Sequence, residues 1–125
     1  MQTNDADQLR IAICAQGDRV HTWNLPDHQL QDTERGVVAY RDEEPIAALV
    51  WREYRAHEGP QSWLKQGYVY LQSAWIDPRH RGRDVISALA SALRQQHPQG
   101  SIHGNGPGAT LVAAFINNYD PARAR

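Results

Sequence analysis

The sequence predicts an α/β (α+β) fold, with a mixed, mainly antiparallel sheet of about five strands and two principal helices. Runs rich in apolar, β-branched and aromatic residues at 37–40, 46–51 and 68–76 follow one another with turn or loop residues between them. Consecutive strands of this kind form an antiparallel meander. Two later segments, 84–97 and 109–119, repeat apolar residues at helical spacing.

The N-terminal part has the least defined pattern. Residues 9–15 alternate for part of their length, which is typical of a strand. Residues 16–35 contain Pro26 and only scattered apolar side chains, so the prediction is either one short helix near 27–33 or a long loop.

A hairpin and a loop come next. Strands at 36–41 and 45–55 are joined by the charged turn Asp42-Glu43-Glu44, which indicates a β-hairpin. Residues 56–66 contain glycine and proline and are predicted to form a loop, with Trp63 as the side chain that anchors it.

A strand and a helix at 70–97 form the centre of the predicted domain. The strand ends at Asp77-Pro78, because proline cannot donate to a strand ladder. The helix at 84–97 has one apolar face, formed by Val85, Ile86, Leu89, Ala92 and Leu93. A short strand at 100–104 and a second helix at 109–119 follow. The apolar face of the second helix is formed by Val112, Phe115, Ile116 and Tyr119.

Composition indicates a single domain over 1–125. The 125 residues are 41% hydrophobic and 22% charged, and the net charge of −1 provides no general attraction for nucleic acid or an anionic membrane. Cys14 is the single cysteine, which excludes an internal disulfide and favours a reducing compartment. The polar N-terminus and the lack of a membrane-length apolar run lead us to expect a cytoplasmic protein. The six histidines show no ligand-like spacing, so no metal site is expected.

The segment between the central strand and helix is basic. It reads Arg79-His-Arg-Gly-Arg83 and leads into a helix N-terminus. Free backbone N–H groups, the positive end of the helix dipole and three arginines suit an anion. The alternative is a solvated basic connector between two elements.

Residues Ile76-Asp-Pro-Arg-His-Arg-Gly-Arg83 and the following helix resemble the acyl-CoA motif of the GNAT acetyltransferase superfamily. Pro78, Arg81 and Gly82 match the motif. The resemblance implies that the turn holds the CoA pyrophosphate and that the end of the strand pairs with the pantetheine arm. The implied binding residues are Ala74, Trp75, Ile76, Arg81, Gly82, Arg83, Asp84, Ile86 and Ser87.

Two positions depart from the family pattern. Asp84 and Ile86 stand where the family has small residues, and a small residue allows close approach of a phosphate. Aspartate is also a good helix N-cap, so the interpretation of Asp84 is that it caps the helix. A carboxylate there would occupy backbone amides that the cofactor needs.

No catalytic group follows directly from the resemblance. Gln72 stands at the position of the family's glutamate, six residues before the motif proline, and cannot titrate. Asn117 falls at the place of the family's tyrosine, and Tyr119 lies two residues beyond it, where a core or interface role is favoured. Tyr70, Glu53 and His103 are further polar groups that could face the cleft.

Two functions therefore remain open. The first is an acetyl-CoA-dependent N-acyltransferase that acts on a small-molecule or protein amine. The second is a catalytically degenerate domain that binds a protein or, less favoured, nucleic acid, because a basic turn contacts any phosphate. The family normally continues with two further strands beyond residue 119, so we expect a homodimer that covers the sheet edge or apolar face.

Overall fold

The computed structural model of the chain describes residues 9–22, 25–80, 82–98, 100–106 and 108–119. A five-stranded sheet has the order β1-β4-β5-β6-β7, and each pair is antiparallel except β6 and β7, which are parallel. The fold class predicted from the sequence is confirmed. The five strands are β1 (Arg10–Cys14), β4 (Glu34–Arg41), β5 (Glu44–Tyr54), β6 (Tyr68–Ile76) and β7 (Ile102–Gly104).

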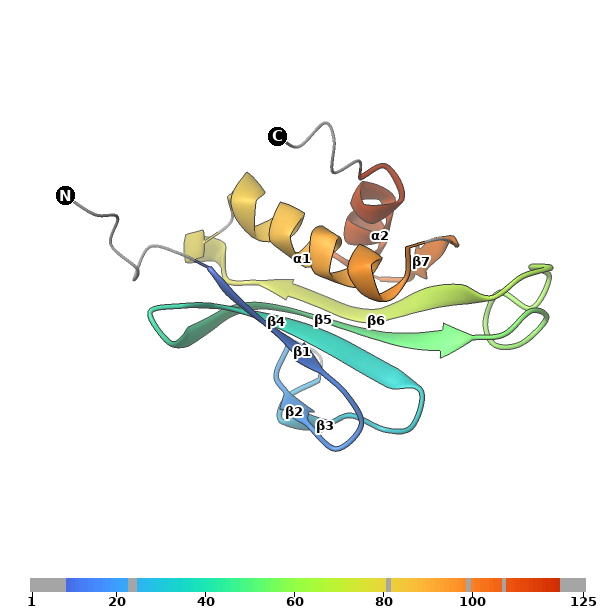
Figure 1. Cartoon of the computed structure of the whole chain (residues 1–125), viewed down its shortest axis with the longest axis horizontal. Coiled ribbons are helices and arrows are strands. Elements are labelled where there is room, and N and C mark those ends of the chain that lie inside the picture. Colours follow the sequence, from blue (N-terminus) through green and yellow to red (C-terminus); the bar gives the residue numbers. More distant parts are fainter. Residues whose placement is uncertain (1–8, 23–24, 81, 99, 107, 120–125) are drawn as a thin grey trace.

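Two helices, α1 (Arg83–Gln96) and α2 (Ala109–Asn117), cover one face of the sheet (Figure 1). The predicted apolar face of α1 is confirmed, because Val85, Leu89 and Leu93 have no exposed surface. They pack in one cluster with Trp51 of β5 and Ile116 of α2. Burial of a large aliphatic side chain contributes about 1.5–3 kcal/mol, so this cluster holds α1 across the sheet. No helix among the described residues is long and apolar enough to cross a membrane.

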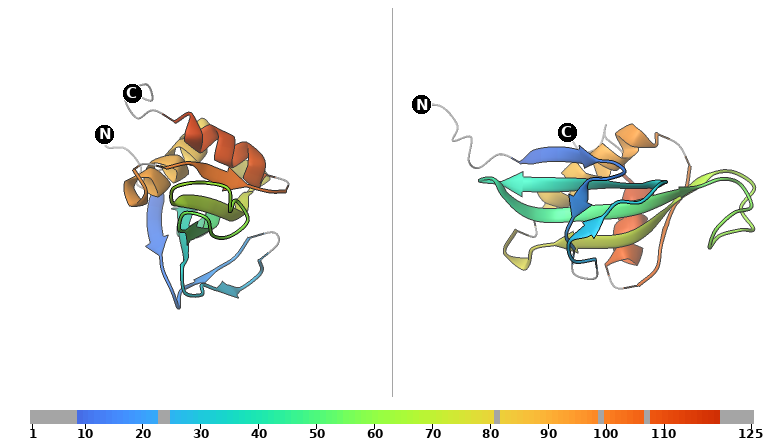
Figure 2. Two further views of the ribbon diagram at one scale, coloured as in Figure 1. Left: turned by 90° about the vertical axis from the view of Figure 1, so that its right-hand side faces the viewer. Right: turned by 90° about the horizontal axis from the view of Figure 1, so that it is seen from below.

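The opposite face is covered by the segment between β1 and β4 (Figures 1 and 2). It forms a small two-stranded sheet of β2 (Arg19–Val20) and β3 (His28–Gln29). The predicted helix near 27–33 is therefore wrong. Asp27 and Thr33 have φ of 47° and 69°, outside the right-handed helical region, and Leu30 is the single deeply buried anchor between them.

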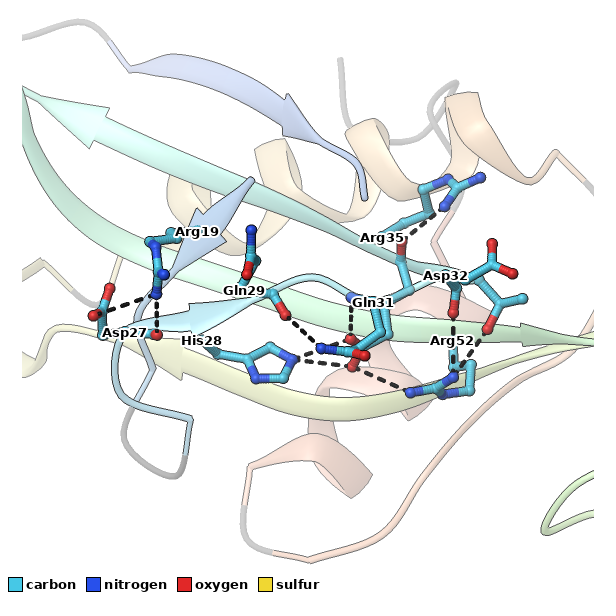
Figure 3. A network of polar contacts seen from close by, with 10 residues as sticks. Arg19, Asp27, His28, Gln29, Gln31, Asp32, Arg35 and Arg52 are labelled. Carbon is cyan, nitrogen blue, oxygen red and sulfur yellow. Dashed lines mark hydrogen bonds and ion pairs between the residues drawn. The ribbon is translucent and has the colours of Figure 1, made fainter. Parts of the chain in front are cut away.

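A buried carboxylate ties this segment to the sheet. Glu34 is 1% exposed, and it accepts a hydrogen bond from the backbone N–H of Gln31 at 2.6 Å. His28 Nε2 lies 3.1 Å from one carboxylate oxygen, and Arg52 Nη2 lies 3.5 Å from the other (Figure 3). A buried carboxylate is tolerated only when paired and hydrogen-bonded, and this arrangement meets both conditions.

The two hairpin connections are held in different ways. The turn between β4 and β5 places Asp42 and Glu43 at φ of 56° and 63°, as a two-residue type I′ turn requires. The loop between β5 and β6 is not anchored by Trp63, which is 67% exposed, so that prediction is wrong. The hydroxyl of Tyr68 holds the loop instead: it donates to the carbonyl of Glu58 at 2.5 Å and accepts from the N–H of Gln61 at 2.9 Å.

Strand β6 lies inside the sheet, as predicted, with β5 on one side and β7 on the other. Its pairing with β5 changes register between Val50 and Trp51, which pair with Ser73 and Leu71. Gln72 is therefore the extra residue of a β-bulge. Bulges interrupt the ladder and redirect the chain, and they occur often beside functional sites.

Candidate functional site

The turn between β6 and α1 is built by its own hydrogen bonds. The N–H of Asp77 donates to the carbonyl of Ile46 at 2.7 Å, and a short 3₁₀ turn at Pro78–His80 follows. The N–H of His80 donates to the carbonyl of Asp77 at 2.8 Å. Gly82 is the N-cap residue of α1. The turn thus presents the N-terminus of α1, whose first N–H groups have no intrahelical acceptor, at the end of β6.

The charge of Arg79 is largely balanced within the turn. Its guanidinium lies 2.8 Å from Asp77 and 3.9 Å from Glu44. The hydrogen bonds from the Arg79 side chain and backbone lower the pKa of Asp77 to about 2, and Asp77 in turn raises the pKa of Arg79. Arg79 is therefore less available to an external anion than the sequence pattern suggests.

Asp84 does not cap the helix, so the sequence-based interpretation is wrong. The cap position is one residue before the helix and needs a non-helical backbone, and Gly82 occupies it while Asp84 is the second residue of α1. The Asp84 carboxylate instead accepts a hydrogen bond from Arg41 Nη2 at 2.8 Å. Arg41 Nη1 also lies 3.5 Å from Nδ1 of His80. Sequence reasoning missed Arg41, because 43 positions separate it from Asp84 and only the β4–β5 hairpin brings the two together.

The C-terminal half of β6 has an open edge. Strand β7 pairs only with Val69, Tyr70 and Leu71, and its last pair is Leu71 with Gly104. Beyond this pair, no strand of the described residues pairs with positions 72–76 on the β7 side. An unpaired strand edge presents N–H and C=O groups to another extended chain. This edge leads directly into the turn before α1.

The predicted binding residues occupy different surroundings. Ala74 and Ile76 belong to the cluster under the helices, and Trp75 packs against the cluster on the opposite face. Ile86 packs against the helix-side cluster, and Ser87 is half-buried on α1. Arg81, which matches the motif, lies outside the described residues, as does the side chain of Arg83.

The catalytic candidates separate in space. Gln72 lies at the bulge and its Oε1 is buried without a hydrogen-bond partner among the described residues. Tyr119 packs against the helix-side core beside Phe115, at 6.2 Å between ring centroids, which fits a packing role. Asn117 joins α2 to β7: its amide donates to the carbonyl of Ile102 at 2.7 Å and accepts from the Ile102 N–H at 2.9 Å.

Three polar groups noted in the sequence, Tyr70, Glu53 and His103, also separate. Glu53 lies on the helix side, where its Oε2 is 2.5 Å from Nε2 of His97 at the end of α1. Tyr70 and His103 are register partners on β6 and β7. Ile102 belongs to the helix-side core, so strand alternation turns His103 to the opposite face.

Two pockets lie beside these elements. One, of about 370 Å³, is at the far end of α1 and includes Glu53, Tyr68 and His97 in its wall. The other, of about 290 Å³, lies on the β2–β3 face and is lined mainly by apolar groups, Trp75 and Val38 among them. Within the described residues, no three histidine, cysteine, aspartate or glutamate side chains converge as a metal site would require.

The model of the acetyltransferase (GNAT) family matches residues 7–116. The chain belongs to this family. No protein of curated function matches the sequence.

Solved structures agree on the fold. A ribosomal-protein-alanine N-acetyltransferase from Brucella melitensis is 11% identical, with a TM-score of 0.55, over 87% of this chain and 88% of that one. An aminoglycoside acetyltransferase from an uncultured soil metagenomic sample, in complex with sisomicin, is 13% identical, with a TM-score of 0.58, over 91% and 88%. A "predicted acetyltransferase with acetyl-CoA" from Clostridium acetobutylicum is 10% identical, with a TM-score of 0.50, over 71% and 59%. At these identities the likeness is one of fold.

Proposed function

We propose that this GNAT protein is an acetyl-CoA-dependent N-acyltransferase that transfers an acetyl group to a primary amine. The observation that carries the proposal is the open edge of β6 at 72–76, which leads without interruption into the turn before α1. The edge suits an extended arm that contains amides, and the turn suits a pyrophosphate. One extended ligand with both parts is acetyl-CoA.

The residues fit this ligand with one exception. The pantetheine arm would pair with backbone groups of 74–76, and Gly82 would allow the pyrophosphate to approach the start of α1. The exception is Asp84, whose negative charge stands in the first turn of α1 and is only partly offset by Arg41. We therefore propose that acetyl-CoA binds in spite of a local repulsion.

The acceptor is an amine, and two structural relatives suggest probes for it. One relative is an aminoglycoside acetyltransferase in complex with sisomicin, and the other is a ribosomal-protein-alanine N-acetyltransferase. We further propose that the protein acts as a homodimer. Strand β1 is an edge of the five-stranded sheet and has Ile13 45% exposed, and an unpaired edge strand can pair with a second copy. Leu111 of α2, which is 76% exposed, marks a second surface to test.

Calorimetric titration tests the proposal most directly. We expect acetyl-CoA to bind more tightly than either of its parts, acetyl-pantetheine for the β6 edge and ADP for the turn. Release of free thiol from acetyl-CoA, measured with sisomicin and with a peptide that begins with alanine, then tests transfer. Absence of acetyl-CoA binding up to millimolar concentration would overturn the proposal and favour the alternative of a non-catalytic binding domain.

A further inference from the structure

One ionisable side chain lies where the two parallel strands part. His103 is the register partner of Tyr70, and the next pair, Leu71 with Gly104, is the last before β6 and β7 diverge. Gln72, the extra residue of the bulge, follows at once on β6. The backbone of His103 therefore lies one residue before the open edge along which the proposed thioester arm would lie, and its ring packs beside Ser101 and Tyr68.

The hydrogen bond of His103 leaves one ring nitrogen free. Nε2 lies 2.8 Å from the Ser101 hydroxyl, and Nδ1 has no hydrogen-bond partner among the described residues. In the tautomer in which Nε2–H donates to Ser101 Oγ, Nδ1 carries an unshared lone pair. The hydroxyl can accept from Nε2–H before and after Nδ1 takes a proton, so protonation breaks no hydrogen bond.

The surroundings keep the imidazole uncharged at neutral pH. The titratable groups that face it from β6 are the Tyr68 ring, at 5.5 Å and edge-on, and Tyr70. Helix α2, which packs on the other side of β7, contains no charged or titratable residue. Burial lowers the pKa of His103 below its usual 6.5. A neutral imidazole is the form that can accept a proton.

We propose that His103 is the general base of this enzyme and takes the proton of the acceptor ammonium through Nδ1. The inference rests on the proposed function. An alkylamine has a pKa near 10, so at pH 7 it arrives as an ammonium without a nucleophilic lone pair. His103 removes one proton, and the amine nitrogen forms a C–N bond with the thioester carbonyl carbon.

The remaining step balances without a further reactant. As the tetrahedral intermediate collapses, the C–S bond breaks and a second proton from the amine nitrogen passes to the departing sulfur. The products are an amide, the free thiol of CoA and an imidazolium, which returns its proton to solvent. Glu53 does not compete for this role, because its carboxylate is held by His97 on the helix side of the sheet.

The test uses His103→Gln, with His57→Gln on the exposed β5–β6 loop as the matched control. With sisomicin as acceptor, we expect His103→Gln to lower kcat/KM by about 100-fold or more, the contribution of a general base, while His57→Gln leaves it unchanged. The acid limb of the pH profile should disappear in His103→Gln. In Ser101→Ala it should move to lower pH, because the imidazolium loses an acceptor. Hydroxylamine, which is mostly unprotonated at pH 7, should be acetylated nearly equally by the parent protein and His103→Gln.

A second measurement does not depend on the acceptor. Diethyl pyrocarbonate modifies neutral imidazoles, and peptide mapping identifies the histidine that reacts. We expect acetyl-CoA to protect His103 and not His57. Unprotected His103 at saturating acetyl-CoA, or an unchanged acid limb in a folded His103→Gln, overturns the assignment although the protein binds its thioester. Failure of acetyl-CoA to bind in the calorimeter is a different result, since it removes the proposed function itself.

Discussion

Removal of the Asp84 charge should strengthen acetyl-CoA binding. The carboxylate lies in the first turn of α1, 2.8 Å from Arg41, and its side chain is 61% exposed. A pyrophosphate at the start of α1 would lie roughly 7 Å away, where two unit charges interact by about 1.2 kcal/mol at an effective dielectric constant of about 40. Arg41 offsets part of this repulsion. We therefore expect Asp84→Asn to bind acetyl-CoA more favourably by about 1 kcal/mol, which lowers Kd roughly 5-fold at low salt.

The assay is titration calorimetry of acetyl-CoA at two ionic strengths. The gain should shrink at high salt, because exposed charges are screened. Asp32→Asn is the matched control, since it removes the same charge from an exposed position in the wall of the pocket at the far end of α1. Arg41→Gln should have the opposite sign and weaken binding, because it leaves Asp84 uncompensated. Equal affinity of the parent protein and Asp84→Asn at low salt would refute the reasoning.

Four further outcomes are expected. Arg81→Ala should weaken acetyl-CoA binding in the calorimeter without lowering Tm, as the family motif implies; unchanged affinity would make the turn a simple connector. The low pKa of Asp77, about 2 against an ordinary 3.8, stabilises the fold above pH 3.8, and this contribution is lost as the pH falls through 2. The difference in Tm between the parent protein and Asp77→Asn should therefore be full near neutrality and vanish below pH 2; a constant difference would contradict the assignment. Glu34→Ala should cost about 3 kcal/mol or somewhat less in urea unfolding, because Arg52 and His28 lose their buried partner but keep some access to water. Light scattering should give a dimer at micromolar concentration, and a dimer that persists in Leu111→Ser would exclude the α2 face as its interface.

The sequence was sufficient to predict a helix or a strand where one local pattern of apolar residues determines that element. The spacing of Val85, Leu89 and Leu93 predicts α1, and all three are fully buried against the sheet. The same holds for the β4–β5 hairpin, whose apolar strands and charged turn are local signals. The resemblance of 76–83 to the family motif added the expectation that the turn before α1 holds a pyrophosphate, which no local pattern contains.

The sequence was insufficient where the conformation of a segment, or the partner of a side chain, depends on residues far away in the chain. The segment at 27–33 contains residues compatible with a helix. It is not helical, and its His28 pairs with the buried Glu34 of β4, which also pairs with Arg52 of β5. Trp63 was predicted to anchor the loop because it is large and apolar. The side chain that holds the loop is Tyr68, whose hydroxyl forms hydrogen bonds with the loop backbone. The partner of Asp84 could not be predicted either, because Arg41 lies at the end of β4 and comes close to Asp84 only in the folded sheet.

The bulge at Gln72 has a consequence for how β6 tolerates change. Before it, odd-numbered Val69 and Leu71 face the helices, and after it, even-numbered Ala74 and Ile76 do so. Because of the single extra residue, odd-numbered side chains face the helices before the bulge and even-numbered side chains face them after it. Deletion of Gln72 would place Ser73 directly after Leu71 in a regular strand, so Ala74 and Ile76 would still face the helices and Trp75 would stay on the opposite face. A deletion at this position thus keeps both faces of the strand, and what it removes is the interruption of the ladder and the local bend at the start of the open edge.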